Sequence, residues 1–565
     1  MSYNKNFIVT IPKGTIPVKS GGKTYIYHVV EKNYRKDKKN NSDVRVPVGI
    51  KIEDTNTMYI NNNFLKYYKE EYEAKNSDDI NTKKLMFSDG ITYGQTAVIY
   101  KMSEKIGLTQ ILKNNFDIDE NKNSNTLLNL ASKFILTNNS SIISYPHFAR
   151  NNLILGNEIE SDTKIENILG SIEECDIDSF LSDWLSHTCK GRDLLLSIDG
   201  SNVQTEANDI EIVELGLSKN KLFENQYSLT LVTEQETYTP VYYKEYQGTT
   251  HDLQAAQVII NTITKANPKT INFVLDRGYF SKELMKKILK SGNGFIMMAK
   301  ENKNIREIID SVYSEIYDVD NYIPDLDLYG YTTVRKPFNN EDKSLFYHIY
   351  YSDYVKVECT KKIHTQVKEL KEEAIKLIGK NKIDINVEKY NKCLNLTFID
   401  EKLTKVETNK ENVNNELKYS GYFVIISSYI TSSEKAYNVY HNRDYTEKLI
   451  MMMKTFEQFD VVRCHDIKHL KAKNVCMFIG LILRNEIFIR TKELRKNTKD
   501  KKAFTTTEII RELGCIQATK DSDGRYSNKS AYTKKEKAIL QALDLQISSI
   551  EGMLTMFNRQ FSIKR

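Results

Sequence analysis

The chain has 565 residues, of which 40% are hydrophobic and 28% are charged, and its formal net charge is +6. This length exceeds what one ordinary hydrophobic core accommodates, so we expect several domains. The composition is that of a globular protein and excludes a chain that is disordered throughout. The mild positive charge is compatible with binding a polyanion such as DNA, but does not require it.

Membrane, secreted and disulfide-stabilised classes are all disfavoured. No run of about 18 apolar residues occurs, and the first residues lack the pattern of a secretory signal, so we expect a cytosolic location. The cysteines are odd in number and form no C-x-x-C pair, which argues against a disulfide framework. They are Cys175, Cys189, Cys359, Cys393, Cys464, Cys476 and Cys515.

The sequence pattern of residues 1–190 predicts a small sheet followed by helices. Residues 1–92 contain the β-type runs FIVTIP and KTYIYHVV and are predicted to form a small N-terminal module, a first guess for DNA-end recognition. The basic stretch YRKDKKNNSDVR at 34–45 is a DNA-backbone contact or a solvated loop, and we favour the loop. Apolar spacing over 93–190 is helical, which predicts a helical module.

Residues 191–300 have a distinctive order of elements. Three strands (DLLLSIDGSNV, QYSLTLVT and PVYYKEYQG) are followed by a helix at about 251–265, a strand INFVLDRG, a helix SKELMKKILKSG and a strand FIMMAK. Three antiparallel-type strands followed by alternating helix and strand are typical of a ribonuclease-H-like fold. The predicted fold class is therefore α/β, a ribonuclease-H-like mixed sheet flanked by helices, with an inserted subdomain and N-terminal and C-terminal modules.

The pattern loosens over 301–418, where β-like runs and a long charged helix predict an inserted subdomain. The core pattern resumes with GYFVIISS, a helix at about 442–458 and the strongly apolar helix NVCMFIGLILRNEIFI, so 419–495 is predicted to complete the catalytic core. Residues 496–565 are predicted to form a helical C-terminal tail.

Two aspartates follow apolar strand-like runs. Asp199 closes LLLSID and Asp276 closes NFVLD, and each is followed by a glycine within two residues, which would let the chain bend there. Such carboxylates at the ends of adjacent strands converge on one cleft, where they would suit a pair of divalent ions if they lie within about 10 Å of each other. For either aspartate alone, an ordinary turn is an equally good explanation.

The third acidic residue lies in the predicted helix after 440. Tyr440, Arg443, Glu447 and Lys454 follow the pattern Y-x2-R-x3-E-x6-K, which places the last three on one helix face. Glu447 offers oxygen ligands to a hard cation, Arg443 and Lys454 suit phosphate, and Tyr440 suits base stacking or a phosphate oxygen. The alternative is an amphipathic surface helix with an internal Arg–Glu salt bridge.

A zinc site is a weaker hypothesis. Cys464, His465, His469 and Cys476 have suitable side chains, but C-x4-H-x6-C lacks the paired spacing of ordinary zinc modules. No phosphate-binding loop of the G-x4-G-K-[ST] type and no G-x-S-x-G motif occurs. ATP-driven action and acyl transfer are therefore not indicated.

The segments SIDGSNV, VLDRGYFSKELMKKILKSGNGFIMMAK and YHNRDYTEKLIMMMKTFEQF resemble the three acidic motifs of bacterial insertion-sequence DDE transposases. More narrowly, they resemble the YREK group, which is insertion-sequence-four-like and carries a long insertion between the second Asp and the Glu. About 170 residues separate Asp276 from Glu447 here. Asp444 and Tyr445 depart from the Trp-containing helix start of many relatives.

The resemblance implies that Asp199, Asp276 and Glu447 are the catalytic metal ligands and that Tyr440, Arg443 and Lys454 bind the transposon end. It also implies two Mg²⁺ or Mn²⁺ ions, which activate water to free a 3′ hydroxyl that then attacks a target phosphodiester. The expected partners are double-stranded DNA, as terminal inverted repeats and target, and a second copy of the chain on paired ends. A cytoplasmic, nucleoid-associated bacterial enzyme is expected.

Two alternatives remain open beside an active transposase. One is a host-adopted nuclease or recombinase of the same fold, which would lack terminal inverted repeats around its gene. The other is a non-catalytic DNA-binding regulator. The presence of all three acidic residues argues against the regulator.

Overall fold

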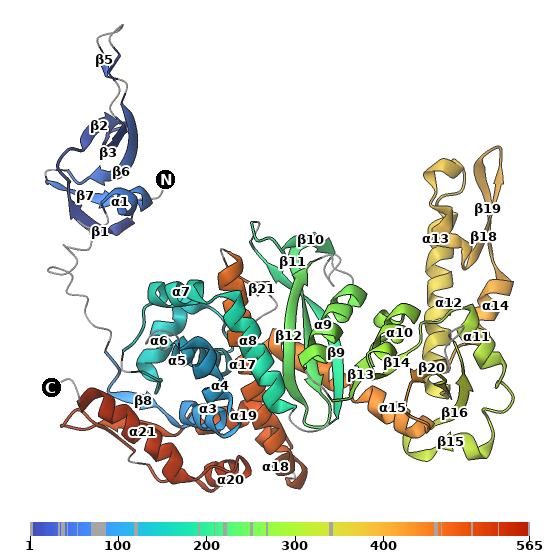
Figure 1. Cartoon of the computed structure of the whole chain (residues 1–565). Coiled ribbons are helices and arrows are strands. Elements are labelled where there is room, and N and C mark those ends of the chain that lie inside the picture. The colour runs from blue at the N-terminus through green and yellow to red at the C-terminus, as the bar shows by residue number, and fades with distance from the viewer. Residues whose placement is uncertain are drawn as a thin grey trace. The chain divides into compact units, whose positions relative to one another are not determined.

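The structure is a computed structural model of the whole chain. It describes residues 4–31, 34–35, 40–41, 43–53, 55–68, 86–117, 123–156, 158–189, 193–207, 209–217, 223–248, 252–266, 269–337, 343–456, 461–464, 466–498, 501–528 and 530–562. The chain forms two compact units, Met1–Met86 and Phe87–Arg565. Figure 1 shows the helices and strands of each unit.

The first unit is a small antiparallel sheet with the strand order β1-β7-β6-β3-β2. One short helix, α1 (Asn62–Tyr67), follows the sheet, and Asn61 caps it by accepting a hydrogen bond from the Asn63 backbone. Val48, Met58 and Phe64 belong to its small buried core. The strands are β1 (Asn4–Thr10), β2 (Ile16–Ser20), β3 (Lys23–Glu31), β6 (Val44–Lys51) and β7 (Thr57–Ile60).

The basic stretch at 34–45 is described only in part, at 34–35, 40–41 and 43–45. Two short strands, β4 (Tyr34–Arg35) and β5 (Asn40–Asn41), pair with each other within it. At its end, Arg45 forms an ion pair with Asp43 at 3.4 Å. The predicted choice between a DNA contact and a solvated loop therefore stays a prediction.

The second unit is built on a mixed sheet with the strand order β10-β11-β9-β13-β14-β20-β17-β16-β15, and β12 also pairs with β11. β11 is antiparallel to β9 and β12, whereas β13 and β14 run parallel to β9. This confirms the predicted ribonuclease-H-like mixed sheet. The first strands are β9 (Leu194–Thr205), β10 (Glu214–Leu217), β11 (Phe223–Glu234), β12 (Thr239–Gln247), β13 (Ile271–Leu275) and β14 (Gly294–Met298).

Helices cover both faces of this sheet, as the alternating directions of the side chains along β13 show. Phe273 and Leu275 are buried in the large core that also contains residues of α9 (Asp252–Ala266) and α10 (Lys282–Lys290). Val274 points to the other face, where it packs with Tyr440 of α15 (Ser433–His441). Because side chains alternate along a strand, Asp276 follows Val274 toward the α15 face.

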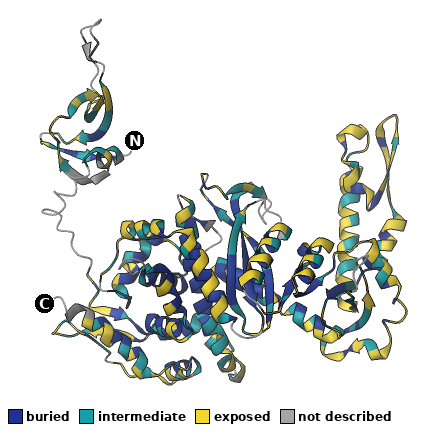
Figure 2. Cartoon of the chain, viewed as in Figure 1, coloured by how far each residue is buried: buried dark blue, intermediate teal, exposed yellow. Residues whose placement is uncertain are grey.

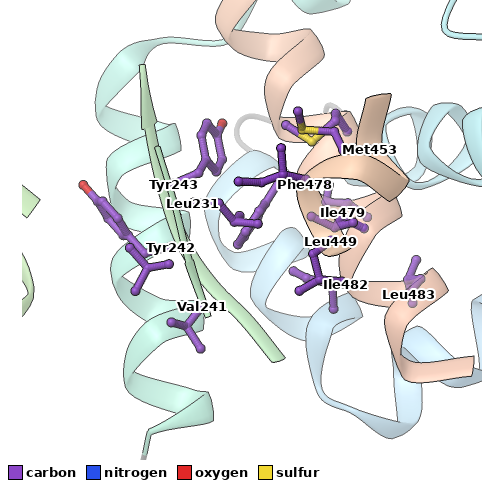
Figure 3. Packing of buried hydrophobic residues seen from close by; sticks show 14 of the residues in the cluster. Leu231, Val241, Tyr242, Tyr243, Leu449, Met453, Phe478, Ile479, Ile482 and Leu483 are labelled. Carbon is purple, nitrogen blue, oxygen red and sulfur yellow. The ribbon is translucent and has the colours of Figure 1, made fainter. Parts of the chain in front are cut away.

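The predicted helix NVCMFIGLILRNEIFI forms the centre of α17 (Ile467–Arg490), whose middle is almost entirely buried. Its Phe478 ring lies 4.9 Å from that of Tyr243 on β12, and Leu231 of β11 belongs to the same core (Figure 3). The buried Asn474 of α17 accepts a hydrogen bond from Tyr227 and donates one to Glu245. The helix therefore joins the sheet to the helices that precede it.

Those preceding helices are the predicted helical module. They surround the other side of α17, with α5 and α7 in contact with it. The helices are α3 (Gly94–Lys105), α4 (Leu108–Phe116), α5 (Asn123–Thr137), α6 (Tyr145–Asn151), α7 (Asp162–Ser171) and α8 (Glu174–Thr188).

The C-terminal segment is helical but also contains strands that the sequence pattern does not predict. β22 (Gln517–Lys520) pairs with β8 (Gly90–Thr92), so the two ends of the second unit lie together. The other elements are α18 (Lys492–Asn497), α19 (Thr506–Leu513), β23 (Tyr526–Ser527), α20 (Lys534–Ala542) and α21 (Ile547–Ser562). Within the described ranges, no helix is long and apolar enough to span a membrane.

The range 301–418 contains two kinds of structure. Its first part adds strands to the central sheet, because β17 pairs with β20 and β16 pairs with β17. These elements are α11 (Lys303–Asp310), β15 (Tyr322–Ile323), β16 (Leu328–Arg335), β17 (Leu345–Tyr351) and β20 (Tyr422–Ser427).

The second part, 353–420, is an excursion that leaves the sheet after β17 and returns at β20. It has its own small core, which includes Ala374, Tyr390 and Leu403, and most of its other residues are exposed (Figure 2). The Ser352 backbone donates to Gly421 O at 3.1 Å, so its two ends meet. Its elements are α12 (Asp353–Ile375), α13 (Val387–Asn391), β18 (Leu394–Ile399), β19 (Lys402–Thr408) and α14 (Lys410–Lys418).

Candidate active site

Asp199 and Asp276 lie at neighbouring positions of the central sheet. The parallel register pairs Leu275 of β13 with Ile198 of β9, so the next residue on each strand is one of the two aspartates. Neighbouring strands are about 4.8 Å apart, which is within the separation that two ligands of one metal pair require.

The local structure at Asp199 differs from the prediction. Asp199 lies in the middle of β9, not at its end, and Gly200 continues the strand by pairing with Thr230 of β11. What ends at this point is the parallel pairing with β13. The glycine is therefore not required for a bend, because the long antiparallel pairing with β11 carries β9 onward as far as Thr205.

The third motif is divided between two helices. Tyr440 lies in the last turn of α15, Arg443 lies in the turn after it, and Glu447 lies in the first turn of α16 (Asp444–Phe456). The single continuous helix face predicted for Arg443, Glu447 and Lys454 therefore begins one residue too early.

Arg443 lies between two of the three carboxylates. Its Nη2 atom is 2.8 Å from Glu447 Oε1 and 3.7 Å from Asp276 Oδ1. One guanidinium nitrogen therefore links the end of β13 to the first turn of α16. The side chain is only 8% exposed. The Arg–Glu salt bridge considered as the alternative is thus present, but it is buried in the site and not on a surface helix.

The electrostatics of Arg443 follow from this position. Burial opposes its charge, but Tyr440, Asp276 and Glu447 together hold its pKa above the usual range. Its Nε and Nη1 atoms are buried and have no hydrogen-bond partner in the described part of the chain. The side chain therefore retains donors that an anion would satisfy.

Tyr440 contacts Asp276 directly. Its hydroxyl donates a hydrogen bond to Asp276 Oδ1 at 3.1 Å, and its ring is 3% exposed in the core beneath α15. Burial raises the pKa of this hydroxyl well above its usual range, so it remains a donor. The ring has no open face for base stacking here, and the contact that the structure shows is the orientation of Asp276.

Lys454 lies two turns beyond Glu447 on α16. Its Nζ atom donates to the backbone oxygen of Asn202 at 2.6 Å, three residues after Asp199 on β9. This bond attaches the C-terminal half of α16 to the strand that carries the first aspartate.

Asp199 is the carboxylate whose acidity the site alters most clearly. Burial raises its pKa to about 6, and the negative charges of Glu447 and Asp276 act in the same direction, whereas Arg443 opposes the rise. Three acidic groups therefore share one positively charged neighbour. A site with this excess of carboxylates favours an additional cation.

The donor set fits a hard divalent cation, because carboxylate oxygens are the ligands that Mg²⁺ and Mn²⁺ prefer. Among the described residues, however, no three His, Cys, Asp or Glu side chains are placed closely enough to hold a metal ion as they stand. Arg443 lies between Asp276 and Glu447 and contacts both.

The zinc hypothesis finds no support within the described residues. Cys476 is fully buried in the core, and His469 faces Asp466 through Nδ1 and Glu166 through Nε2. His465 lies outside the described residues. The cysteines that are described are free thiols.

Three basic residues near the site were missed by the sequence analysis. Arg277 follows Asp276 directly, and Lys300 and Lys303 follow β14, the strand beside β13. The signal was the run AKENKN at the carboxyl end of a core strand, where sites of α/β sheets lie.

Fold and site together define the class of protein: a ribonuclease-H-like sheet with aspartates at neighbouring positions of two adjacent strands and a glutamate on a later helix, where Arg443 contacts the second aspartate and the glutamate. The family model described as transposase DDE domain matches residues 190–483. The chain belongs to this family, and the matched range runs from just before β9 into α17. No curated protein matches the chain.

One solved structure similar to the chain is that of a piggyBac transposase in a synaptic complex with hairpin DNA. The sequences are 11% identical, the match covers 74% of this chain and 79% of that chain, and the TM-score is 0.37. A likeness this weak carries no argument about fold or function.

Proposed function

We propose that the chain is an active transposase that cleaves and joins DNA strands at the ends of an insertion sequence, with Asp199, Asp276 and Glu447 as its metal ligands. The observation that supports this proposal is that the buried Arg443 contacts both Asp276 and Glu447, while Asp199 lies beside Asp276 in the parallel register of β9 and β13. Family membership supports the reaction class.

Two Mg²⁺ or Mn²⁺ ions bound there would activate the attacking oxygen and stabilise the leaving one. The surrounding residues have separate tasks. Tyr440 orients Asp276 through its hydroxyl, and Lys454 fixes α16 against β9. Arg443 uses its two unpartnered nitrogens to hold a phosphate oxygen, because a planar guanidinium matches phosphate geometry.

The proposed substrate is double-stranded DNA, first as the terminal inverted repeats of the element and then as the target. The arrangement Tyr440, Arg443, Glu447 and Lys454 supports placement in the YREK group. A homodimer on paired ends, acting on the nucleoid in the cytoplasm of a bacterium, completes the proposal.

Cleavage of a labelled duplex that carries the element's own terminus tests the proposal. Wild type and Glu447→Gln are compared with Mg²⁺, and Lys448→Gln, a neighbouring substitution on α16, is the matched control. Nicking at the terminus by wild type and the control, but not by Glu447→Gln, is the expected result. Equal nicking by all three proteins would remove Glu447 from the site, and binding without nicking would favour the regulator.

A further inference from the structure

A groove opens beside the carboxylate site, between the central sheet and the excursion. It has a volume of about 740 Å³ and is lined by residues of α11 and α14 and by residues that follow β13, β14, α13 and α14. Arg277 is the lining residue closest in sequence to the catalytic edge, since Asp276 precedes it. The groove therefore begins directly beside the proposed catalytic site.

The charge of the groove is decided by which of its ionic side chains are already paired. Arg306 contacts Glu301 at 2.6 Å and Glu416 at 2.7 Å, and its guanidinium lies 4.8 Å from the Tyr419 ring. Lys418 contacts Asp310 at 2.6 Å. Lys392, which also lines the groove, contacts Glu416 at 3.8 Å. Three cations thus balance three of the acidic groups on the groove.

The remaining charges are mainly positive. Arg277, Lys300 and Lys303 are exposed, and no acidic side chain pairs with any of them in the part of the chain that the structure describes. Among the acids of the groove, Glu307 alone lacks a cation partner within those same ranges. The groove consequently presents three uncompensated cations against one carboxylate.

The walls of the groove are held in place by the same ion pairs. Arg306 lies on α11 and Glu416 on α14, so their contact joins the sheet side of the groove to the excursion. Tyr419 donates to Asp310 at 2.7 Å and joins the two sides a second time. The free cations therefore lie on a surface that is fixed before a ligand arrives.

We infer that this groove binds the sugar-phosphate backbone of duplex DNA that extends from the catalytic site, with Lys300 and Lys303 each contacting a phosphate and Arg277 contacting the phosphate nearest to Asp276. This inference rests on the proposed function. Exposed, unpaired lysines and arginine suit phosphates because they release counterions on binding, and they select charge and not base sequence.

The salt dependence of DNA binding tests the inference. Each phosphate contact contributes about 0.9 to the slope of log K against log salt concentration for duplex DNA. Lys300→Ala with Lys303→Ala is expected to reduce the magnitude of that slope by about 1.8. The reduction is expected both on a duplex carrying the element's terminus and on an unrelated duplex, because backbone contacts carry no sequence information.

The matched control is Lys287→Ala with Lys290→Ala. These two exposed lysines lie on the neighbouring helix α10 and do not line the groove, so the control removes the same charge elsewhere. An unchanged slope in the groove variant would overturn the inference. An equal reduction in the control would also overturn it, since the effect would then come from net charge.

Conservative substitution excludes a folding defect. Lys300→Arg with Lys303→Arg keeps both charges and is expected to retain the wild-type slope, and thermal unfolding of all variants shows whether the fold is intact. Failure of the proposed function would appear differently: wild-type protein would not nick the terminus, while the groove variant would still show the reduced salt slope.

Discussion

Arg443 Nη2 lies 2.8 Å from Glu447 Oε1, and the same nitrogen faces Asp276. One arginine thus compensates charge on two carboxylates that come from different parts of the sequence. The relationship makes Arg443 part of the folded architecture of the site as well as a proposed contact for DNA.

Arg443→Gln is expected to destabilise the protein by about 1–3 kcal/mol, because Asp276 and Glu447 lose a shared partner while both carboxylates keep some access to water. Added Mg²⁺ is expected to raise the unfolding temperature of this variant more than that of wild type, since a cation would replace the missing charge. Thermal unfolding with and without Mg²⁺ measures both effects. A variant as stable as wild type would contradict the expectation.

Asp199→Asn tests the effect of burial on the carboxyl. The pKa of Asp199 is raised in the folded state to about 6, so its protonated form is favoured by folding and its stabilising contribution is complete below the unfolded pKa. That contribution is lost as the pH rises through 6. Without added metal, we therefore expect wild type to lose on the order of 1–3 kcal/mol relative to Asp199→Asn between about pH 4 and pH 7.

Chemical denaturation of both proteins across this pH range measures that difference. Ser201→Ala, which alters another residue of β9 but no carboxyl, is the control and is expected to follow wild type in its pH dependence. Parallel stability curves for wild type and Asp199→Asn would show that the Asp199 pKa is not raised.

Tyr440→Phe removes the hydroxyl that donates to Asp276 and keeps the buried ring. We expect a loss of about 1 kcal/mol in stability and a higher Mg²⁺ concentration for half-maximal nicking, because Asp276 is no longer oriented. Tyr437→Phe, on the same helix α15, is the matched control. If the two variants require the same Mg²⁺ concentration, Tyr440 does not position Asp276.

Phe478→Ala tests the core that joins α17 to the sheet. Phe478 is fully buried and contacts the rings of Tyr243 and Phe180, so a loss of about 3–5 kcal/mol in the free energy of unfolding is expected. Met451→Ala, at a side chain that is 62% exposed, is expected to change stability by less than about 0.5 kcal/mol. Urea denaturation of both variants distinguishes these outcomes.

The order of strands and helices along 191–300 could be predicted because its signals are local. The hydrophobic periodicity of β9 through β14 changes from strand to helix to strand within a short range, and each element is bounded by turn residues. The extension of the sheet could not be predicted in this way. β20 pairs with β14 across more than a hundred residues, and nothing in either strand's own pattern identifies the other.

The candidate site, too, could be predicted only in part from the sequence. The neighbouring positions of Asp199 and Asp276 follow from two strands that run parallel, which the element order indicates. The burial of Tyr440 and Arg443 depends instead on where α15 packs, because both residues belong to types that are commonly found at surfaces. Their contacts with Asp276 are tertiary, so the spacing of the motif does not indicate them.

The meeting of Ser352 and Gly421 has a consequence for how the chain is assembled. Gly421 has φ of +93°, and a side chain there would come within 3.0 Å of Ser352 O, so the two strands are joined closely at this point. Topologically, 353–420 is an oversized hairpin loop, and closing a long loop costs only slightly more entropy than closing a shorter one. A two-residue turn in its place would leave β17 and β20 paired and would keep Arg277, Lys300 and Lys303, but it would remove the wall of the groove that α14 supplies.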